Sequence, residues 1–556
     1  MNYKLFLVTV LLLVAGAGCT STSSSNAPSN SNNNMMGNPS SSQVDPMREH
    51  CKMMPEMPGC EKYQNQHSST SLDSIDRSIN GLSDAVKEAS VSLNNGDTYP
   101  LTASFVKNTI NGITIRMLAY NGQIPGPILQ VKQGDSIKID FKDNLDEPTT
   151  VHWHGIRVEN ASDGVPGVTQ PAIKPGESYT YNLNFPDAGF YWYHPHVRED
   201  YQQELGMYGL IWVEPSSTNY FDPVNREEFL ALNDILLAGN DVAPYDKERV
   251  NYTLMGRFGN VMLVNGEEQY SLKVNQGDVV RFPIVNTAST RVFKLSLPGV
   301  KMKLVGADSG GYKNDTWVDS VTLGPSERAI VEVQFTKAGD YKLNHTTPSK
   351  TYTLGVITVS NTKTDHDYSK EFQTLKDRSS EFFALNLSSY YSKAPDKELD
   401  MTIKMPGMMD GMHMDGMMDT KSSDGIEWED AMPMMNSASN DQSLIWVLRD
   451  KTTGQENHQI EYSFKKGDQV KIRLFNDPNS MHPMQHVIHF HGNRFIVLSV
   501  NGVKNTNPVW KDSVLVPMGA KVDILLDATN PGAWMGHCHI AEHMESGMMM
   551  TYKVSE

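Results

Sequence analysis

The stretch VKQGDSIKI (residues 131–139) is repeated in the same chain as VNQGDVVRF (274–282) and FKKGDQVKI (464–472). Each copy places a Gly-Asp turn before a strand in which apolar and polar side chains alternate. A further turn, alternating strand, Gly-containing turn and strand follow each copy, and such self-similarity indicates a repeated structural unit. Short β-branched and aromatic runs broken by Gly, Pro and Asn are typical of sandwiches. The sequence therefore predicts an all-β protein with three copies of one Greek-key β-sandwich.

The repeats divide the chain into predicted segments. We expect β-sandwich domains at residues 98–218, 219–362 and 363–556. Residues 20–97 are low in large apolar side chains and rich in Ser and Asn, so we expect a disordered tether there. Residues 405–436 form a methionine-rich insert in the third domain, because Gly and Asp interrupt them and they lack the alternation of a strand.

The composition narrows the classes of function. The formal net charge of −17 argues against nucleic-acid binding, because the phosphate backbone attracts basic surfaces. Four cysteines in 556 residues cannot form a disulfide network that holds the whole chain together. The 31 methionines outnumber the 18 phenylalanines and the 22 tyrosines, although protein cores use methionine sparingly. This excess predicts a second use for the thioether groups.

The first 19 residues have the features of an export signal, with one Lys, an apolar run that is short for a membrane span, and small residues at the end. We therefore expect an exported protein in the periplasm or cell envelope. The ending GAGC resembles a bacterial lipobox, which would attach a lipid anchor to Cys19 in the membrane. Ala15 and Ala17 also fit ordinary signal cleavage, which would leave no anchor.

A cluster of soft side chains lies within the predicted tether, in HCKMMPEMPGCEKY (residues 50–63). Thiolate and thioether groups so close together predict a soft-metal site formed by His50, Cys51, Met53, Met54, Met57 and Cys60. A disulfide between Cys51 and Cys60, closing a small loop in an oxidising compartment, is the alternative.

Histidines occupy matching places in the first and third copies. The first copy has VHWHG (151–155) and YWYHPH (191–196), and the third has HVIHFHG (486–492) and HCHIAEH (537–543). The second copy keeps the strands but retains His345 alone at these places. Ten of the chain's 17 histidines therefore lie at equivalent positions of copies one and three: His152, His154, His194, His196, His486, His489, His491, His537, His539 and His543. We infer that these two domains meet and share a site.

The spacing of these histidines predicts two different metal sites. Side chains two residues apart on a strand point to the same face, so each H-x-H pair can reach one metal cluster, and four such pairs offer eight ligands. Cys538, between two of these histidines, must point the other way. With His486, His543 and a weak axial Met548 it forms the ligand set of a blue-copper site. Zinc is the competing metal, but a closed zinc site does not need eight further imidazoles.

With all four histidine motifs present in order, the chain resembles a three-domain multicopper oxidase built from cupredoxin repeats over roughly residues 98–556. Laccases and bacterial cuprous oxidases belong to this family. The resemblance implies four copper ions and the coupling of four one-electron oxidations to the reduction of dioxygen to water. It assigns the type 1 ion to His486, Cys538, His543 and Met548, the type 2 ion to His152 and His489, and the type 3 pair to His154, His194, His196, His491, His537 and His539.

The resemblance also points to residues that are not copper ligands. Asp163 resembles the acid that members of this family carry beside the copper cluster. The alternative is that Asp163 only caps a turn, because SDGVPG is itself a turn sequence. Bacterial relatives often carry a glutamate directly after the second type 1 histidine; this chain has Met544 there and Glu545 next, so Glu545 is the candidate proton donor. Cuprous oxidases pair an acid and a Met just before the first type 1 histidine, and those places hold His482 and Met484.

Three functions from different classes fit these observations. The methionine-rich insert favours oxidation of Cu(I), because thioethers select Cu(I) and the interleaved Asp residues attract a cation, so we expect an extra Cu(I) site there. A laccase-like oxidation of small phenols is the alternative enzyme activity. A noncatalytic copper-storage protein is a third possibility, but it would not need ordered H-x-H pairs in two domains. We expect a monomer that uses dioxygen as its oxidant.

Overall fold

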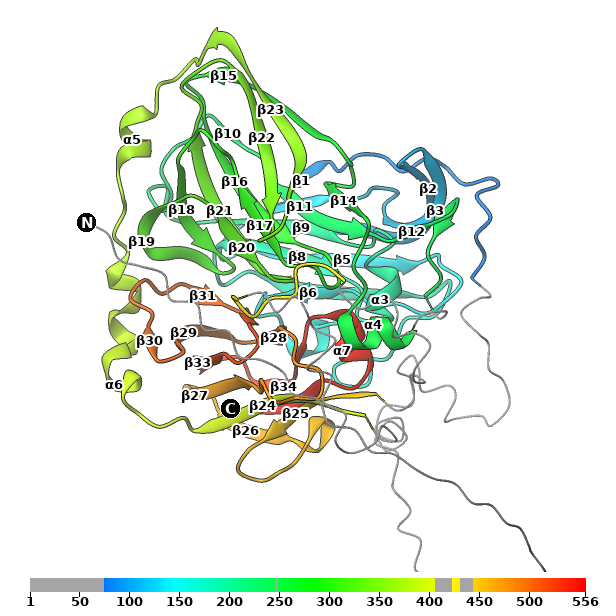
Figure 1. Cartoon of the computed structure of the whole chain (residues 1–556), viewed down its shortest axis with the longest axis vertical. Helices are drawn as coiled ribbons and strands as arrows, with labels where there is room; N and C mark the ends of the chain where they lie inside the picture. The colour runs from blue at the N-terminus through cyan, green and yellow to red at the C-terminus, as the bar shows by residue number, and fades with distance from the viewer. Residues whose placement is uncertain (1–74, 246–248, 406–422, 431–443) are drawn as a thin grey trace, which may run out of the picture. The chain divides into compact units, whose positions relative to one another are not determined.

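Three pairs of sheets, one pair for each copy of the repeat, make up most of the structure (Figure 1). The structure is a computed structural model that describes residues 75–245, 249–405, 423–430 and 444–556. In the first copy, one sheet has the order β3 (Ile113–Tyr120), β2 (Thr98–Ile110), β5 (Ser136–Asp143), β7 (Ser178–Asn184). The other has the order β1 (Ser90–Ser92), β4 (Ile128–Lys132), β9 (Gly209–Glu214), β8 (Gly189–His194), β6 (His152–His154).

The second copy also has two sheets. One runs β14 (Val261–Val264), β11 (Leu230–Ile235), β16 (Val279–Asn286), β21 (Arg328–Gln334), β18 (Met302–Ala307), β19 (Gly310–Val318), with β10 (Arg226–Glu227) beside β16. The other runs β15 (Tyr270–Gln276), β23 (Thr351–Lys363), β22 (Gly339–Thr346), β17 (Phe293–Ser296), β20 (Val321–Leu323). A separate ribbon pairs β12 (Leu237–Ala238) with β13 (Asp241–Val242).

The third copy holds the last two sheets. One runs β25 (Ile445–Asp450), β24 (Lys397–Lys404), β27 (Asp468–Asn476), β33 (Lys521–Ala528), β29 (Arg494–Val500), β30 (Val503–Lys504), with β31 (Trp510–Lys511) beside β29. The other runs β26 (Glu461–Lys465), β35 (Met549–Ser555), β34 (Gly532–Cys538), β28 (His486–Phe490), β32 (Ser513–Val516). Short helices in the described residues are η2 (Asn160–Ser162), α3 (Glu199–Gln202), α4 (Arg249–Met255), α5 (Ser369–Gln373), η3 (Ser379–Leu385), α6 (Leu387–Tyr391), η7 (Asn457–Gln459) and α7 (Ala541–Glu545).

The three copies share one strand order. The strand that follows the Gly-Asp turn is β5, β16 or β27; it pairs in parallel with β2, β11 or β24 and antiparallel with β7, β21 or β33. The second sheets repeat the order β4-β9-β8-β6 as β15-β23-β22-β17 and β26-β35-β34-β28. The predicted all-β fold is confirmed, and the repeated sequence corresponds to a repeated topology.

The backbone angles of the repeated turns explain why all three copies have a glycine at the same place. Gly134, Gly277 and Gly467 have φ angles of 96°, 102° and 93°, in the left-handed region that side chains disfavour. In β5 the strand that follows alternates exposed and buried residues along its whole length, as the hydrophobic pattern predicts. The Gly-Asp turn therefore fixes where each of these strands begins.

The first sandwich begins earlier than the sequence indicated. Residues 75–97, which we assigned to the disordered tether, contain β1, and Ser90 to Ser92 pair in parallel with Ile128 to Gln130 of β4. The Leu93 amide also donates to the Gln130 carbonyl over 2.9 Å. The assignment of this part to a tether was wrong, because backbone hydrogen bonds to a sheet edge can order a segment that has few apolar side chains.

A helix of the second copy completes the core of the third. Leu254 and Met255 of α4, together with Phe258, belong to the same buried cluster as Cys538 and Met548. Figure 1 shows α4 beside α7, and the two helices are in contact. This contact places the second copy directly over the part of the third copy that carries Cys538.

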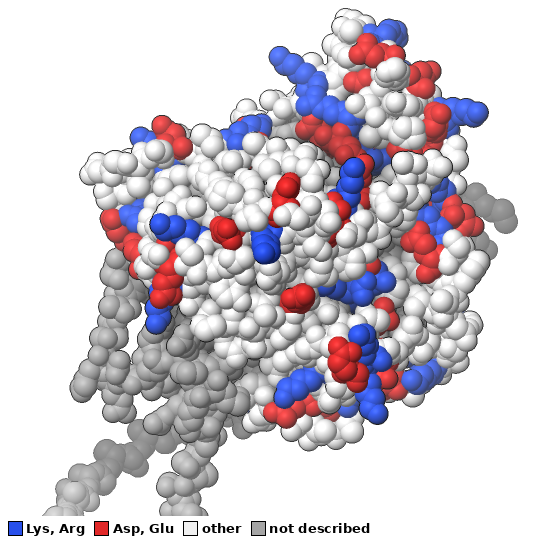
Figure 2. Space-filling model, turned by 180° about the vertical axis from the view of Figure 1, so that it is seen from behind, with Lys and Arg blue, Asp and Glu red and all other residues white. Residues whose placement is uncertain are grey.

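Several predicted features lie outside the described residues. They are the export signal, Cys19, the cluster at 50–63, and most of the methionine-rich insert except Met405 and residues 423–430. Among the described residues, none of the helices has the length and apolar character needed to cross a membrane. On the face drawn in Figure 2, acidic and basic side chains lie interspersed, so the described part of that face carries no continuous basic surface of the kind that binds nucleic acid.

Candidate metal centres

Eight imidazoles from the first and third copies meet in one buried cluster. Within each copy, neighbouring strands bring the H-x-H pairs together, because His152 of β6 lies opposite His194 of β8 and His489 of β28 lies opposite His537 of β34. The eight rings are 0–6% exposed. The predicted cluster residues His152, His154, His194, His196, His489, His491, His537 and His539 are all brought together.

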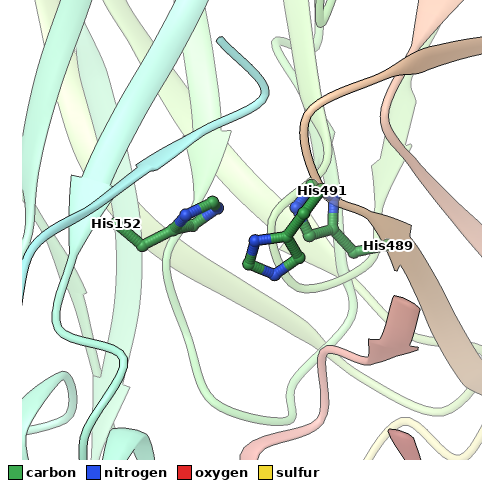
Figure 3. Close-up of side chains that lie close together, drawn as sticks. All are labelled: His152, His489 and His491. Carbon is green, nitrogen blue, oxygen red and sulfur yellow. The ribbon is translucent and has the colours of Figure 1, made fainter. Parts of the chain in front are cut away.

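The two copies contribute rings that face each other. The His154 and His489 rings stack with centroids 3.8 Å apart, and the His152 and His491 centroids are 4.1 Å apart. In Figure 3, His152 approaches from one side and His489 and His491 approach from the other. The Nε2 atoms of His491 and His537 are 3.0 Å apart. The expectation that the first and third copies meet at a common site therefore agrees with the geometry.

Backbone carbonyls fix the tautomers of these rings. The Nδ1–H groups of His152, His194, His489 and His537 donate to the carbonyls of Asp163, Pro195, Asp512 and Cys538 over 2.7–2.9 Å. Because a carbonyl only accepts, the proton lies on Nδ1 and the lone pair lies on Nε2. The Nε2 atoms of His152, His194 and His489 are buried without a hydrogen-bond partner in the described structure. This is the arrangement that metal-binding imidazoles require.

Burial keeps the cluster neutral. Burial and neighbouring histidines hold the pKa of His154, His194, His196, His491, His537 and His539 well below the usual value. Neutral imidazoles are the form that binds a metal ion. The buried, unpartnered nitrogens would cost free energy in a protein that bound nothing there, since a buried polar atom without a partner is unfavourable.

Asp163 lies between rings of both copies and is fully buried. Its carbonyl accepts from His152 Nδ1, and its Oδ2 lies 3.0 Å from His491 Nδ1. Its backbone amide donates to the carbonyl of Asn160, the first residue of η2. Asp163 therefore does end a turn, but its side chain contacts the histidines. The carboxylate therefore links the first copy to the third.

A second set of ligand atoms lies on the far side of the His537–His539 segment. Cys538 Sγ is 3.6 Å from His486 Nδ1 and 3.8 Å from His543 Nδ1, and these two nitrogens are 3.2 Å apart. All three residues are buried. Burial raises the pKa of the Cys538 thiol to about 12, so a metal must displace its proton. One strand thus joins this site to the imidazole cluster.

Met548 is fully buried in the core cluster that also contains Cys538. Its carbonyl accepts from the Cys538 amide over 3.0 Å, and its amide donates to the His543 carbonyl over 3.0 Å. These two hydrogen bonds tie the backbone of the predicted axial residue to two of the predicted ligands.

Trp446 and α4 cover the histidines of the thiolate site. The Trp446 ring centroid is 4.2 Å from that of His543 and 4.8 Å from that of His486, and its indole donates to the Thr253 carbonyl over 2.5 Å. His543 Nε2 donates to the Leu254 carbonyl over 3.3 Å. Neither histidine edge reaches solvent. No pattern in the sequence indicates this cover.

His482 and Met484 are buried near the same histidines. The His482 ring centroid is 6.1 Å from that of Trp446, and burial lowers the pKa of His482 to about 4. Met484 is fully buried in the cluster that contains Cys538. His482 therefore lies beside the thiolate site, and Met484 lies in the core of the same copy.

The acids near the cluster differ from those that we predicted. Glu545 ends α7 half-buried, and its role as proton donor remains a prediction. Met544 packs against Val165 in a small apolar cluster. Glu199, which is not among the predicted residues, is fully buried with Oε1 3.4 Å from His196 Nε2. Burial raises the pKa of Glu199 well above its usual value. Its place three residues after His196 was the available signal.

The donor atoms fit copper at both sites. A cysteine sulfur and two imidazoles, with the thioether of Met548 buried in the same core, match the soft set that copper takes in electron transfer, and the buried imidazole nitrogens without a partner match an imidazole-bound cluster. The fit rests on the fixed tautomers and unpartnered nitrogens described above.

Multicopper oxidase family models match three parts of the chain, residues 103–218, 236–364 and 412–556. The chain is 28% identical to multicopper oxidase mco of Staphylococcus aureus, over 83% of this chain and 90% of that protein. It is 24% identical to copper resistance protein A of Escherichia coli, over 83% and 93%.

Among solved structures, the multicopper oxidase of Pseudomonas thermotolerans is 26% identical, with a TM-score of 0.62 over 84% of this chain and all of that one. The sheets described above are cupredoxin-like, as in these relatives. The chain belongs to the multicopper oxidases, copper-dependent oxidoreductases that use oxygen.

Proposed function

We propose that this multicopper oxidase takes its electrons from Cu(I) and serves copper tolerance outside the cytoplasm. His486, Cys538 and His543 would hold the type 1 ion, with Met548 as a weak fourth ligand. His152 and His489 would hold the type 2 ion, and the other six cluster histidines would hold the type 3 pair, which would give four ions. Bound in this way, copper would supply one-electron oxidation at the thiolate site and reduction of dioxygen to water at the cluster.

The residues of the chain have distinct tasks in this proposal. The carbonyls of Asp163, Pro195, Asp512 and Cys538 hold the Nδ1 protons, so the Nε2 lone pairs face the ions. The Asp163 carboxylate orients His491. Cys538 lies between His537 and His539, which gives a covalent connection from the oxidising site to the cluster.

The main support for Cu(I) as the substrate is that other groups cover the ring edges of His486 and His543, the proposed type 1 histidines. A bulky phenol would need to approach an imidazole edge, but Trp446 and the Leu254 carbonyl lie against His486 and His543. A small ion held by methionine needs less space, and the buried Met484 lies in the same cluster. The name of the relative from E. coli, copper resistance protein A, supports the same choice.

The described residues at and beyond the ends of the methionine-rich insert belong to the third copy. Met405, the first residue of the insert, and Leu444, which lies beyond its end, are buried in the core of that copy. Residues 423–430, here called the strap, are bound beside His486, since the Gln485 side chain accepts from the Glu427 amide over 2.7 Å and donates to its carbonyl over 3.2 Å. The strap, which separates the two groups of methionines in the sequence, is thus held at the residue that precedes His486, and this favours delivery of Cu(I).

Replacing the insert methionines tests the substrate. We expect a variant with Ser at Met408, Met409, Met412, Met414, Met417, Met418, Met432, Met434 and Met435, combined with Met484→Leu, to lose about tenfold in kcat/KM for Cu(I). The strap stays intact, so the kcat/KM for a bulky phenol should be unchanged or higher. The measurement is the ratio of the two constants at equal type 1 copper occupancy.

Met117→Leu is the control, because Met117 is equally buried in the core of the first copy. An unchanged ratio would favour the phenol oxidase. Absence of oxygen uptake with either donor in the unmodified protein would favour copper storage.

Trp446→Ala tests the cover separately. Removing the indole should open an edge of His486 and His543 and raise kcat/KM for a bulky phenol by about tenfold, with a smaller change for Cu(I). The loss of a large buried ring should also destabilise the protein by about 3–5 kcal/mol. Trp446→Phe keeps a ring over the histidines, and we expect its phenol rate to stay near that of the unmodified protein. Equal phenol rates in both variants would contradict a covering role.

A further inference from the structure

Arg328, from the copy that has lost its ligands, lies where the three copies meet. Its side chain is fully buried. Its Nε donates to the Phe190 carbonyl of β8 in the first copy over 3.0 Å, and Nη1 donates to the Ser326 carbonyl over 3.1 Å. Nη1 and Nη2 form a two-point contact with Asp512 of the third copy, at 2.6 and 2.5 Å. Asp308 Oδ2 also lies 3.7 Å from Nη1, so fixed acceptors surround the guanidinium.

Asp512 in turn contacts one cluster histidine of the first copy and one of its own copy, the third. Its Oδ1 lies 3.0 Å from His154 Nε2, and its carbonyl accepts from His489 Nδ1 over 2.8 Å. Since the carboxylate accepts at Nε2, the His154 lone pair lies on Nδ1, and that atom is buried without a partner. His154 therefore presents a different nitrogen to the cluster from His489, and Asp512 determines both orientations.

The motif of the first copy leaves room for this ion pair. Gly155, the last residue of VHWHG, has φ 83°, and a Cβ there would lie 2.3 Å from Asp512 Oδ2 and 2.7 Å from Arg328 Nη2. A side chain at this position would displace one partner or the other. The glycine next to His154 thus fits the presence of the Arg328–Asp512 pair.

We propose that Arg328 is a positioning residue for the oxygen-reducing cluster, acting through Asp512 on His154 of the first copy and His489 of the third. The second copy thus contributes a cation rather than ligands. A carboxylate buried among imidazoles needs a partner, and the planar fork of Arg fixes both of its oxygens where the point charge of Lys would not. The proposal rests on the proposed ligand roles of His154 and His489, and is independent of the reducing substrate.

Arg328→Met removes the cation at similar volume, and Arg328→Lys keeps the charge without the fork. We expect the Arg328→Met holoenzyme to lose cluster copper at a chelator concentration about 10–100-fold lower than the unmodified holoenzyme requires. Metal affinity usually falls by this factor when a residue that supports a metal ligand is removed. The hyperfine splitting of the type 2 electron paramagnetic resonance signal should change, and oxygen uptake should fall, while the blue absorption stays. Arg328→Lys should give an intermediate loss with the same direction of spectral change.

Arg281→Met is the matched control. Arg281 is also buried in the second copy and pairs with Glu332 at 2.8 Å and Glu227 at 2.6 Å, away from the histidines. The Arg281→Met substitution should lower the Tm of the protein without altering the type 2 signal or the resistance of the cluster copper to a chelator. If Arg328→Met behaves like this control, the positioning role is wrong. If Arg328→Met does not fold, Arg328→Lys decides the question. The proposal is wrong if Arg328→Lys has the same type 2 signal and the same chelator resistance as the unmodified protein.

His489→Ala separates this proposal from the ligand assignment on which it rests. Loss of cluster copper in His489→Ala together with an unaffected Arg328→Met would reject the role of Arg328 alone. Retention of cluster copper in both variants would reject the assignment of His489 as a ligand.

Discussion

We expect the replacement of Cys538 with Ser to remove the intense visible absorption of the copper-loaded protein and to abolish its oxidase turnover. Cys538 supplies the thiolate between His486 and His543, at 3.6 and 3.8 Å from their Nδ1 atoms. A hydroxyl is a harder and weaker donor, so the absorption that depends on sulfur bound to copper cannot form. The measurement is the visible spectrum together with oxygen uptake after full copper loading.

The fold should survive this substitution. Cys538 is fully buried, and exchanging sulfur for oxygen changes the side-chain volume little; burying the hydroxyl should cost about 1–3 kcal/mol. His537 and His539 keep their places, so the variant should bind the three cluster ions and lack one. A Cys538→Ser protein that remains blue would disprove the assignment of the type 1 site.

Replacing His489 with Ala should produce the opposite pattern, with the blue colour kept and dioxygen reduction lost. His489 and His486 lie on β28, three residues apart, so they point to opposite faces and serve different sites. The His489 ring stacks on His154 at 3.8 Å, and its Nε2 faces the cluster without another partner. We expect oxygen uptake to fall by at least about 100-fold. Mutating a residue that only hydrogen-bonds to a metal ligand already reduces activity by up to that factor, and His489 is a proposed ligand itself.

His345→Ala is the control for this variant. His345 is equally buried, and it lies in the second copy at a place that corresponds to the ligands elsewhere, but its Nδ1 accepts from the Lys294 amide over 3.0 Å. It should lower stability and leave oxygen uptake intact. Undiminished uptake in His489→Ala would mean that copies one and three do not share the oxygen-reducing cluster.

Features that depend on local periodicity could be predicted from the sequence. Side-chain alternation in a strand brings His152 and His154 to one face and directs Cys538 away from its neighbours, whatever the rest of the chain does. The Gly-Asp turns are also a local feature, and they mark where the strands start. Side chains disfavour the φ angles at Gly134, Gly277 and Gly467, so glycine is needed there.

Contacts between distant residues could not be predicted in this way. Arg328 and Asp512 are separated by 184 positions, and Trp446 meets Thr253 across 193. Neither pair belongs to a repeated pattern, so a single sequence carries no signal that they approach each other. Residues 75–97 were misassigned for a related reason, since the hydrogen bonds that order β1 come from β4 and not from its own side chains.

The burial of α4 in the third copy has a consequence for how the protein is made. The second copy leaves the ribosome before the third, so Leu254, Met255 and Phe258 lack their partners in the core of the third copy until Cys538 and its neighbours have been synthesised. Until then they are an exposed apolar surface that favours aggregation or chaperone binding. Conversely, residues 363–556 produced alone would lack part of their core. Assembly of the thiolate site is thus a late event in biosynthesis that requires two domains to have folded and docked.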